Sequence, residues 1–232
     1  MTPFSHLVDV LHELATARAL KVLAVLAEGM RTRRVVVELC RGPEISLQTK
    51  FGFHAQKDGT LLVAYSTVFR WPRAEEIMRD LRSPPPSDPG TFTPEILEAQ
   101  NALYPIALLR VDEDSKYFDR PSPVRFAPSE LEMIPALLAE VVDVLVEKVI
   151  PQFSCYCDAD QLARVAPEPL AKSRLETDPM RVATILAAAG KKQEFRIWRE
   201  AYRNGFIGSA IARRKARQHH ERYMSALESR LH

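Results

Sequence analysis

The chain has 232 residues, which allows one sizeable hydrophobic core, alone or with a helical extension. Its 46% hydrophobic and 27% charged residues are ordinary for a folded protein and argue against disorder of the whole chain. The formal net charge is only +2, so the bulk charge gives no reason to class the chain as a nucleic-acid-binding protein.

The sequence also bears on where the protein works. No apolar run approaches the roughly 20 residues that a membrane-spanning helix needs. Charged residues and histidines interrupt the apolar stretch near the N-terminus, so this stretch does not resemble a signal peptide. The chain has three cysteines, and an odd number favours a reducing compartment. These observations predict a cytoplasmic protein without a membrane partner.

The first predicted element is a helix over residues 4–29, because apolar residues recur there every three or four positions and Gly29 suits a helix end. Strands are predicted next, at residues 34–40, 44–54 and 61–69. One face of the middle strand consists of Ile45, Leu47, Thr49, Phe51 and Phe53. Asp58-Gly59 is a strong signal for a hairpin turn after that strand. We therefore expect three antiparallel strands with one buried face.

Prolines mark most of the later boundaries. A proline suits the first turn of a helix over residues 72–82, and the proline-rich stretch 83–90 must be a loop. The threonine–proline pair at 93–94 predicts another helix start. Further strands are expected at residues 106–111 and in the extended segment that ends at Phe126.

The remaining predicted elements are helices. The pattern Ser129-Glu130-Leu131-Glu132 is typical of a capping box, and an apolar stripe carries that helix to Ile150. Shorter helices are expected at residues 179–190, 191–203 and 209–231. The predicted fold class is therefore α+β, with an antiparallel sheet of three to five strands packed by helices and an all-helical C-terminal region. We expect a sheet domain over residues 1–153 and a helical region over residues 154–232, which either packs on the first domain or stands apart.

Charge is distributed unevenly along the chain. Residues 191–232 contain 11 basic and 4 acidic residues, a local charge of +7, whereas residues 88–147 contain 4 basic and 12 acidic residues, a local charge of −8. Such separation can steer a charged partner toward one end of a protein. The two regions could equally face each other or be solvated helix surfaces. The candidate partner-binding residues are Asp112, Glu113, Asp114 and Asp119 in the acidic region and Arg213, Arg214, Lys215 and Arg217 in the basic one.

The sequence shows no established catalytic or cofactor-binding motif. It lacks the nucleophile elbow of hydrolases, the phosphate-binding loop of nucleotide hydrolases and the glycine fingerprint of dinucleotide-binding domains. Cys155 and Cys157 could offer two thiolates to zinc, but no second pair completes the four ligands of a closed site. We therefore predict no catalytic residue, no cofactor and no metal site.

One enzyme hypothesis nevertheless follows from the predicted strands. Gln48 and Lys50 share one face of a strand, and Glu38 lies on the strand before it. Restriction-type metal-dependent nucleases have a similar layout, with a carboxylate and a Gln-x-Lys or Glu-x-Lys pattern on neighbouring strands. Glu44 lies too close to Gln48 in sequence to supply that carboxylate from an adjacent strand. The solvent face of an amphipathic strand explains the same residues.

Three stretches carry a resemblance to known domains: Phe51-Gly52-Phe53, the helix entry Arg125–Glu132, and Val149-Ile150-Pro151-Gln152-Phe153. Over residues 35–153 these stretches and the order of elements resemble a group of bacterial cytoplasmic α+β domains of unknown function. Some of those domains accompany interbacterial toxins as immunity proteins. The absence of a catalytic constellation and the separated acidic and basic regions, together with this resemblance, favour a non-enzymatic protein that binds a protein partner, such as a toxin, and neutralises it by occlusion as an immunity or antitoxin protein. The resemblance transfers no functional residue.

Two alternatives belong to other classes of protein. The first is a nucleic-acid-binding protein that uses the basic C-terminal helix to neutralise phosphates. The second is the metal-dependent nuclease, whose residues would be Gln48 and Lys50.

Overall fold

The computed structural model describes residues 3–27, 31–82, 107–109, 123–168, 175–176, 179–205 and 211–231. Its strands are β1 (Lys21–Ala27), β2 (Thr32–Arg41), β3 (Ser46–Ala55), β4 (Leu61–Arg70), β5 (Ala107–Leu109), β6 (Val124–Phe126) and β7 (Leu175–Glu176). Its α-helices are α1 (Pro3–Ala17), α2 (Pro72–Arg82), α4 (Ile134–Val144), α5 (Ile150–Phe153), α6 (Ala159–Val165), α8 (Pro179–Ala188), α9 (Lys192–Gly205) and α10 (Ile211–Arg230). The 3-10 helices are η2 (Pro128–Met133) and η4 (Ser154–Cys157), and η3 (Leu145–Val149) is a π-helical turn.

The chain divides into two compact units. The first comprises Met1–Phe69 and Leu108–Cys157, and the second comprises Arg70–Ala107 and Asp158–His232. The second unit thus includes α2, which the sequence analysis assigned to the sheet domain.

The first unit contains an antiparallel sheet. Its strand order is β1-β2-β3-β4, and β6 pairs with β4 on its own short stretch. Strands β2 and β3 form a long hairpin in which Val37 lies opposite Thr49 and Thr32 opposite His54. The structure confirms the predicted α+β class, the antiparallel sheet of three to five strands and the helical C-terminal region.

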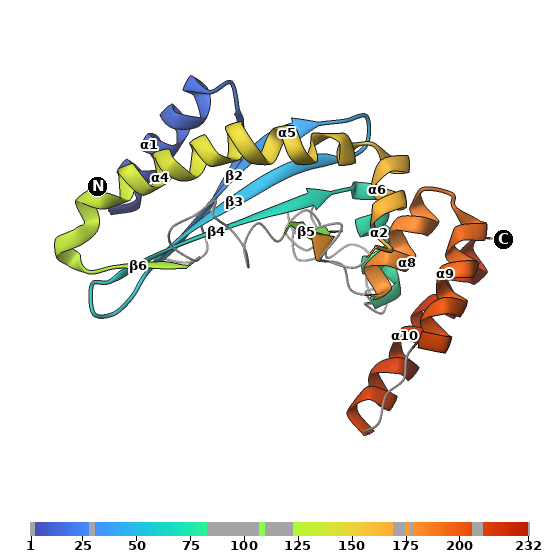
Figure 1. The fold of residues 1–232 in the computed structure, drawn as a ribbon. Coiled ribbons are helices and arrows are strands. Elements are labelled where there is room, and N and C mark those ends of the chain that lie inside the picture. The colour runs from blue at the N-terminus through green and yellow to red at the C-terminus, as the bar shows by residue number, and fades with distance from the viewer. Residues whose placement is uncertain are drawn as a thin grey trace, which may run out of the picture. The chain divides into compact units, whose positions relative to one another are not determined.

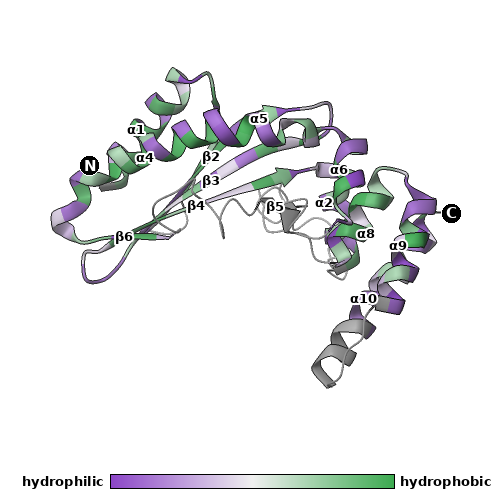
Figure 2. Ribbon diagram, in the orientation of Figure 1, coloured by the Kyte–Doolittle hydropathy of each residue, from purple (hydrophilic) through white to green (hydrophobic). Residues whose placement is uncertain are grey.

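One face of this sheet forms the core of the first unit. The five residues predicted to line one face of β3 are all at most 1% exposed. Helices α1 and α4 lie on the same side of the sheet (Figure 1). Helix α4 is mostly hydrophobic with a few hydrophilic positions (Figure 2), and its buried residues include Ile134, Leu138 and Val141. Burial of apolar side chains from both layers is the main source of stability for such a unit.

The predicted helix over residues 4–29 is wrong in its second half. Helix α1 ends at Ala17, and residues Lys21–Ala27 form strand β1 instead. The helix ends in a Schellman motif: the N–H of Leu20 donates to the carbonyl of Ala15 at 2.9 Å, and Ala19 takes a left-handed conformation with φ of 57°. Glycine usually occupies that position, so the sequence carried no stop signal there.

The predicted capping box also lies elsewhere. Ser129 is not the N-cap; the helical segment begins after Ala127, whose N–H donates to Oε2 of Glu130 at 2.9 Å. Pro128 takes the first helical position, where its missing N–H costs nothing. The helical path then continues through the π-helical turn η3 and past Pro151 to Phe153.

Helix α8 is the central element of the second unit. It contacts α2, α6, α9 and α10, and eight of its ten residues are buried. The Oγ1 atom of Thr184 lies 2.5 Å from the hydroxyl of Tyr223 on α10. Gly190 adopts a φ of 73° just after α8, as its predicted role at the helix end requires. The helices predicted at 72–82, 179–190, 191–203 and 209–231 are thus confirmed. The expected loop at 83–90 and the helix start at 93–94 lie outside the described residues.

Candidate functional site

Of the two predicted partner-binding clusters, the acidic one lies outside the described residues and the basic one lies on a described helix. Asp112, Glu113, Asp114 and Asp119 lie outside the described residues. Arg213, Arg214, Lys215 and Arg217 lie in the first half of α10 as predicted, and the structure describes side chains of that helix from Gln218 onward. Helical spacing places positions 213, 214 and 217 on one side of the helix, because they are three and four residues apart.

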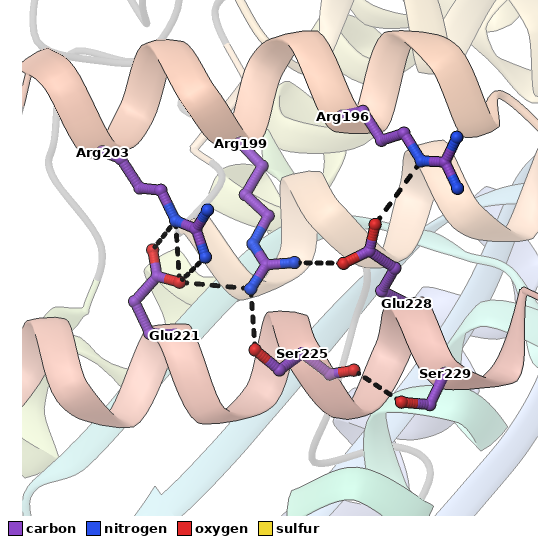
Figure 3. A network of polar contacts seen from close by, with 7 residues as sticks. All are labelled: Arg196, Arg199, Arg203, Glu221, Ser225, Glu228 and Ser229. Atoms are coloured by element: carbon purple, nitrogen blue, oxygen red, sulfur yellow. Dashed lines mark hydrogen bonds and ion pairs between the residues drawn. The ribbon is translucent and has the colours of Figure 1, made fainter.

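An ion network joins α9 to the second half of α10 (Figure 3). Arg199 is buried, with Nη1 at 2.5 Å from Oε2 of Glu228 and Nη2 at 2.7 Å from Oγ of Ser225. The carboxylate of Glu221 accepts hydrogen bonds from Nη2 of Arg203 at 2.7 Å and from Nη2 of Arg199 at 3.2 Å. These bonds, above all the one from Arg203, hold the pKa of Glu221 below its usual value. The network is a structural clamp between two helices.

This clamp leaves the charge of α10 uneven. The two acidic residues of the helix, Glu221 and Glu228, both lie in its second half and bind α9. Residues 211–220 include four arginines and lysines and no acidic residue. The first half of α10 is therefore a cationic segment of the helix, which suits an anionic protein surface or phosphates.

The face of the sheet opposite the core carries the residues of the nuclease hypothesis. Glu38 lies directly opposite Gln48 across the β2–β3 hairpin, so the neighbouring strand does present a carboxylate. That carboxylate binds Nε of Arg41 at 2.8 Å, and Nε2 of Gln48 donates to Oγ of Ser46 at 2.8 Å. Glu44 lies in the turn between the two strands. Among the described residues, no three His, Cys, Asp or Glu side chains gather in a way that could hold a metal ion.

The outer edge of the sheet is apolar. Strand β1 stands first in the strand order, and within the described ranges its outer edge pairs with no other strand. Val25 is 49% exposed and Leu26 is 38% exposed, although both belong to a run of apolar residues. A bulge between Val22 and Ala24 interrupts the pairing with β2, and the register is regular from Ala24 onward. Exposed apolar edges of this kind are templates for an added strand.

Two cysteines that the sequence analysis did not pair come together in the first unit. Sγ of Cys40, on β2, lies 3.2 Å from Sγ of Cys157, at the end of η4. Cys155, which the zinc hypothesis joined to Cys157, is exposed instead. The two paired residues are 117 positions apart in the chain, so no local pattern could have revealed the contact.

A hollow of about 380 Å³ lies open to solvent at the tip of the β3–β4 hairpin. Its lining consists of Arg31, Ala55, Gln56, Lys57 and Asp58. The carboxylate of Asp58 accepts a hydrogen bond from the N–H of Thr60 at 3.0 Å, which lowers the pKa of Asp58. Asp58 thus closes the predicted turn, and most residues that line the hollow are polar or charged, whereas ligand pockets are usually lined by hydrophobic and aromatic side chains.

No helix in the described part of the chain combines the length and the apolar character needed to cross a bilayer. Comparisons with protein families, curated proteins and solved structures found no match, so no family assigns a role to these residues.

Proposed function

We propose that this chain is a non-enzymatic protein-binding protein that neutralises a partner by occluding it, as an immunity or antitoxin protein of the bacterial cytoplasm does. The observation that carries the proposal is the exposed apolar edge of the sheet at β1. Occlusion requires a complementary surface rather than reacting groups, so it needs no catalytic constellation. The partner in this proposal is a protein, such as a toxin.

The edge of β1 offers both backbone and side-chain contacts to such a partner. An extended segment of the partner would add to the regular stretch Ala24–Ala27 and satisfy the outward N–H and C=O groups. Val25 and Leu26 are consecutive, so they project to opposite faces of the sheet. A strand added beside them would therefore find an apolar neighbour on each of its own faces.

Electrostatic steering is the second part of the proposal. The cationic half of α10, with Arg213, Arg214, Lys215 and Arg217, would attract an acidic surface, and Asp112, Glu113, Asp114 and Asp119 would attract a basic one. Reversing the charges in either cluster should slow association and weaken its dependence on salt. Unchanged association rates for both sets would remove steering from the proposal but leave the edge contact.

The same cationic half of α10 supports nucleic-acid binding as a second candidate function. That function predicts an affinity that falls steeply with salt and depends on the four basic residues. The cross-strand pair of Glu38 and Gln48 keeps the nuclease testable as well. It predicts divalent-metal-dependent cleavage that is lost in Lys50→Ala and Gln48→Ala, with Glu38→Gln as a third variant.

The test is affinity purification of the tagged full chain from its native cell, with and without nuclease treatment, followed by mass spectrometry. We expect one stoichiometric protein partner that survives nuclease. The double variant Val25→Lys/Leu26→Lys should lose this partner, because two charges at the edge oppose strand addition. Ile197→Lys on α9 is the matched control, since Ile197 is 62% exposed and lies in the other unit.

Three outcomes would contradict parts of the proposal. Recovery of nucleic acid alone would replace the proposed function with the nucleic-acid alternative. Full retention of the partner by the β1 double variant would exclude the edge as its binding site. Sedimentation of the purified chain as a dimer that the double variant converts to a monomer would show that a second copy occupies the edge.

A further inference from the structure

The contact between Cys40 and Cys157 is held in place by the structure around it. Gly42 follows Cys40 at the turn of the β2–β3 hairpin, and a Cβ atom at Gly42 would lie 2.2 Å from the carbonyl oxygen of Cys157. The missing side chain therefore lets the backbone of η4 approach the hairpin closely. The ring of Tyr156 packs between Phe69 and Phe153, with centroids 6.4 and 6.1 Å away. The two thiols thus lie close together because η4 packs against the β2–β3 hairpin.

The distance between the two thiols suits a reversible bond. Both are free, and their sulfur atoms lie 3.2 Å apart. A disulfide bond is about 2.05 Å long, so the sulfurs need to move toward each other by only about 1 Å. Small rotations of the two side chains can supply such a movement.

The two thiols have different environments. Cys40 is half-buried, whereas Cys157 is only 4% exposed. The hydrogen bond with Cys157 lowers the pKa of Cys40, while that shared bond and burial raise the pKa of Cys157. The more accessible thiol is thus the one that ionises more easily. This is the arrangement of an attacking cysteine and a resolving cysteine.

We propose that Cys40 and Cys157 form a thiol–disulfide exchange site whose substrate is a low-molecular-weight disulfide. The thiolate of Cys40 attacks one sulfur of the small disulfide, forms a mixed disulfide and releases one small thiolate, which takes up a proton. Cys157 then gives up its proton as its sulfur attacks Sγ of Cys40, forms the intramolecular bond and expels the second small thiolate, which takes up that proton to become a thiol. The protein loses two electrons and two protons, and the small disulfide gains them as two thiols.

This site is independent of the proposed partner binding. In a reducing compartment the resting state is the dithiol, and the disulfide forms when the small-thiol pool becomes oxidised. The bond would tie the end of η4, the last residue of the first unit, to strand β2. It closes a long loop of the chain, so the oxidised protein should unfold at a higher temperature than the reduced one.

In the test, the reduced full chain is incubated with oxidised glutathione and the remaining thiols are alkylated. Mass spectrometry then shows which cysteines carry the alkyl group. We expect the loss of alkylation at Cys40 and Cys157, with Cys155 still alkylated. The control variant Cys155→Ser should behave like the wild type. The variant Cys157→Ser should accumulate a glutathione adduct on Cys40, because the resolving thiol is missing, whereas Cys40→Ser should leave Cys157 reduced.

Two results would overturn the proposal. One is a wild-type protein in which glutathione modifies Cys155 while Cys40 and Cys157 remain alkylated. The other is a disulfide between Cys155 and Cys157, which Cys40→Ser would leave intact. If a variant at Cys40 or Cys157 fails to fold, the maps of the wild type and of Cys155→Ser decide the question by themselves.

Discussion

Arg199 of α9 and Glu228 of α10 form an ion pair in which the arginine side chain is only 7% exposed. Arg196, one turn earlier on α9, also binds Glu228, but its side chain is 57% exposed and the two atoms lie 3.4 Å apart. The two arginines thus reach the same carboxylate from different environments (Figure 3). Buried and exposed ion pairs differ strongly in what their loss costs, so this pair of arginines is a direct comparison.

Arg199→Ala should destabilise the protein more than Arg196→Ala. We expect a loss of about 3 kcal/mol in the free energy of unfolding for Arg199→Ala, because Glu221 and Glu228 lose their most buried cation. Arg196→Ala should cost at most about 0.5 kcal/mol. Urea denaturation followed by far-ultraviolet circular dichroism measures both. Equal losses would show that the clamp does not depend on burial.

Glu221 should contribute to stability in a pH-dependent way. Its pKa is lowered from the usual 4.5 by the hydrogen bonds from Arg203 and Arg199. A group whose pKa is lower in the folded state stabilises that state fully above the unfolded value and loses the contribution as pH falls through the folded value. The melting temperature of the wild type should therefore decrease as pH falls below about 4.5, and Glu221→Gln should reduce this acid sensitivity.

Arg203→Gln is the companion variant for this prediction. It removes the largest cause of the lowered pKa, so it should also reduce the acid sensitivity. The double variant Arg203→Gln/Glu221→Gln should add little to either single change, because both remove the same interaction. Full additivity would mean that the two side chains act separately.

The sequence predicted the hairpin sheet well because its signals are local. Alternation along β3 placed Phe51 and Phe53 in the core, and Asp58-Gly59 marked the turn. The sequence of β1 does not distinguish a strand from a helix, because Val22, Leu23 and Leu26 fit either period over so short a run. Pairing with β2 decides the outcome, and that pairing is a tertiary property.

The candidate sites were predictable to different degrees. The basic residues of α10 follow from composition. The pairing of Glu38 with Gln48 does not follow from the turn alone, because a bulge between Glu38 and Cys40 shifts the register of the hairpin by one residue. The contact between Cys40 and Cys157 does not follow, because it depends on how η4 packs on the sheet. The acids that clamp Arg199 were visible in sequence, but their pairing required the relative placement of α9 and α10.

Glu75 should be among the most sensitive residues of the second unit. Its side chain is fully buried, binds Nε and Nη2 of Arg70 at 2.6 and 2.7 Å, and accepts the N–H of Trp71 at 3.1 Å. Glu75→Gln should lower the free energy of unfolding by about 3 kcal/mol, because it leaves a largely buried arginine without its counter-charge. Glu76→Gln should cost about 0.5 kcal/mol or less, since Glu76 is 64% exposed. Chemical denaturation of the two variants side by side measures both losses in the free energy of unfolding. Equal losses would contradict this prediction.

Gly42 should control whether the two thiols can meet. A Cβ atom at this position would lie 2.2 Å from the carbonyl oxygen of Cys157, which is backbone and cannot move aside alone. Gly42→Ala should therefore displace η4, cost about 1–3 kcal/mol of stability and slow the formation of the bond between Cys40 and Cys157. Gly52→Ala is the control in the same hairpin, because its Cβ would meet the movable ring of His54 at 3.0 Å.

The measurement is the rate at which oxidised glutathione protects Cys40 and Cys157 from alkylation in each variant. Gly52→Ala should match the wild type, and Gly42→Ala should be slower even under conditions in which it remains folded by circular dichroism. An unchanged rate in folded Gly42→Ala would mean that the close approach of η4 to the hairpin does not bring the thiols together. A slow rate in both variants would point to a general loosening of the hairpin, because only Gly42 faces the backbone of η4 among the described glycines.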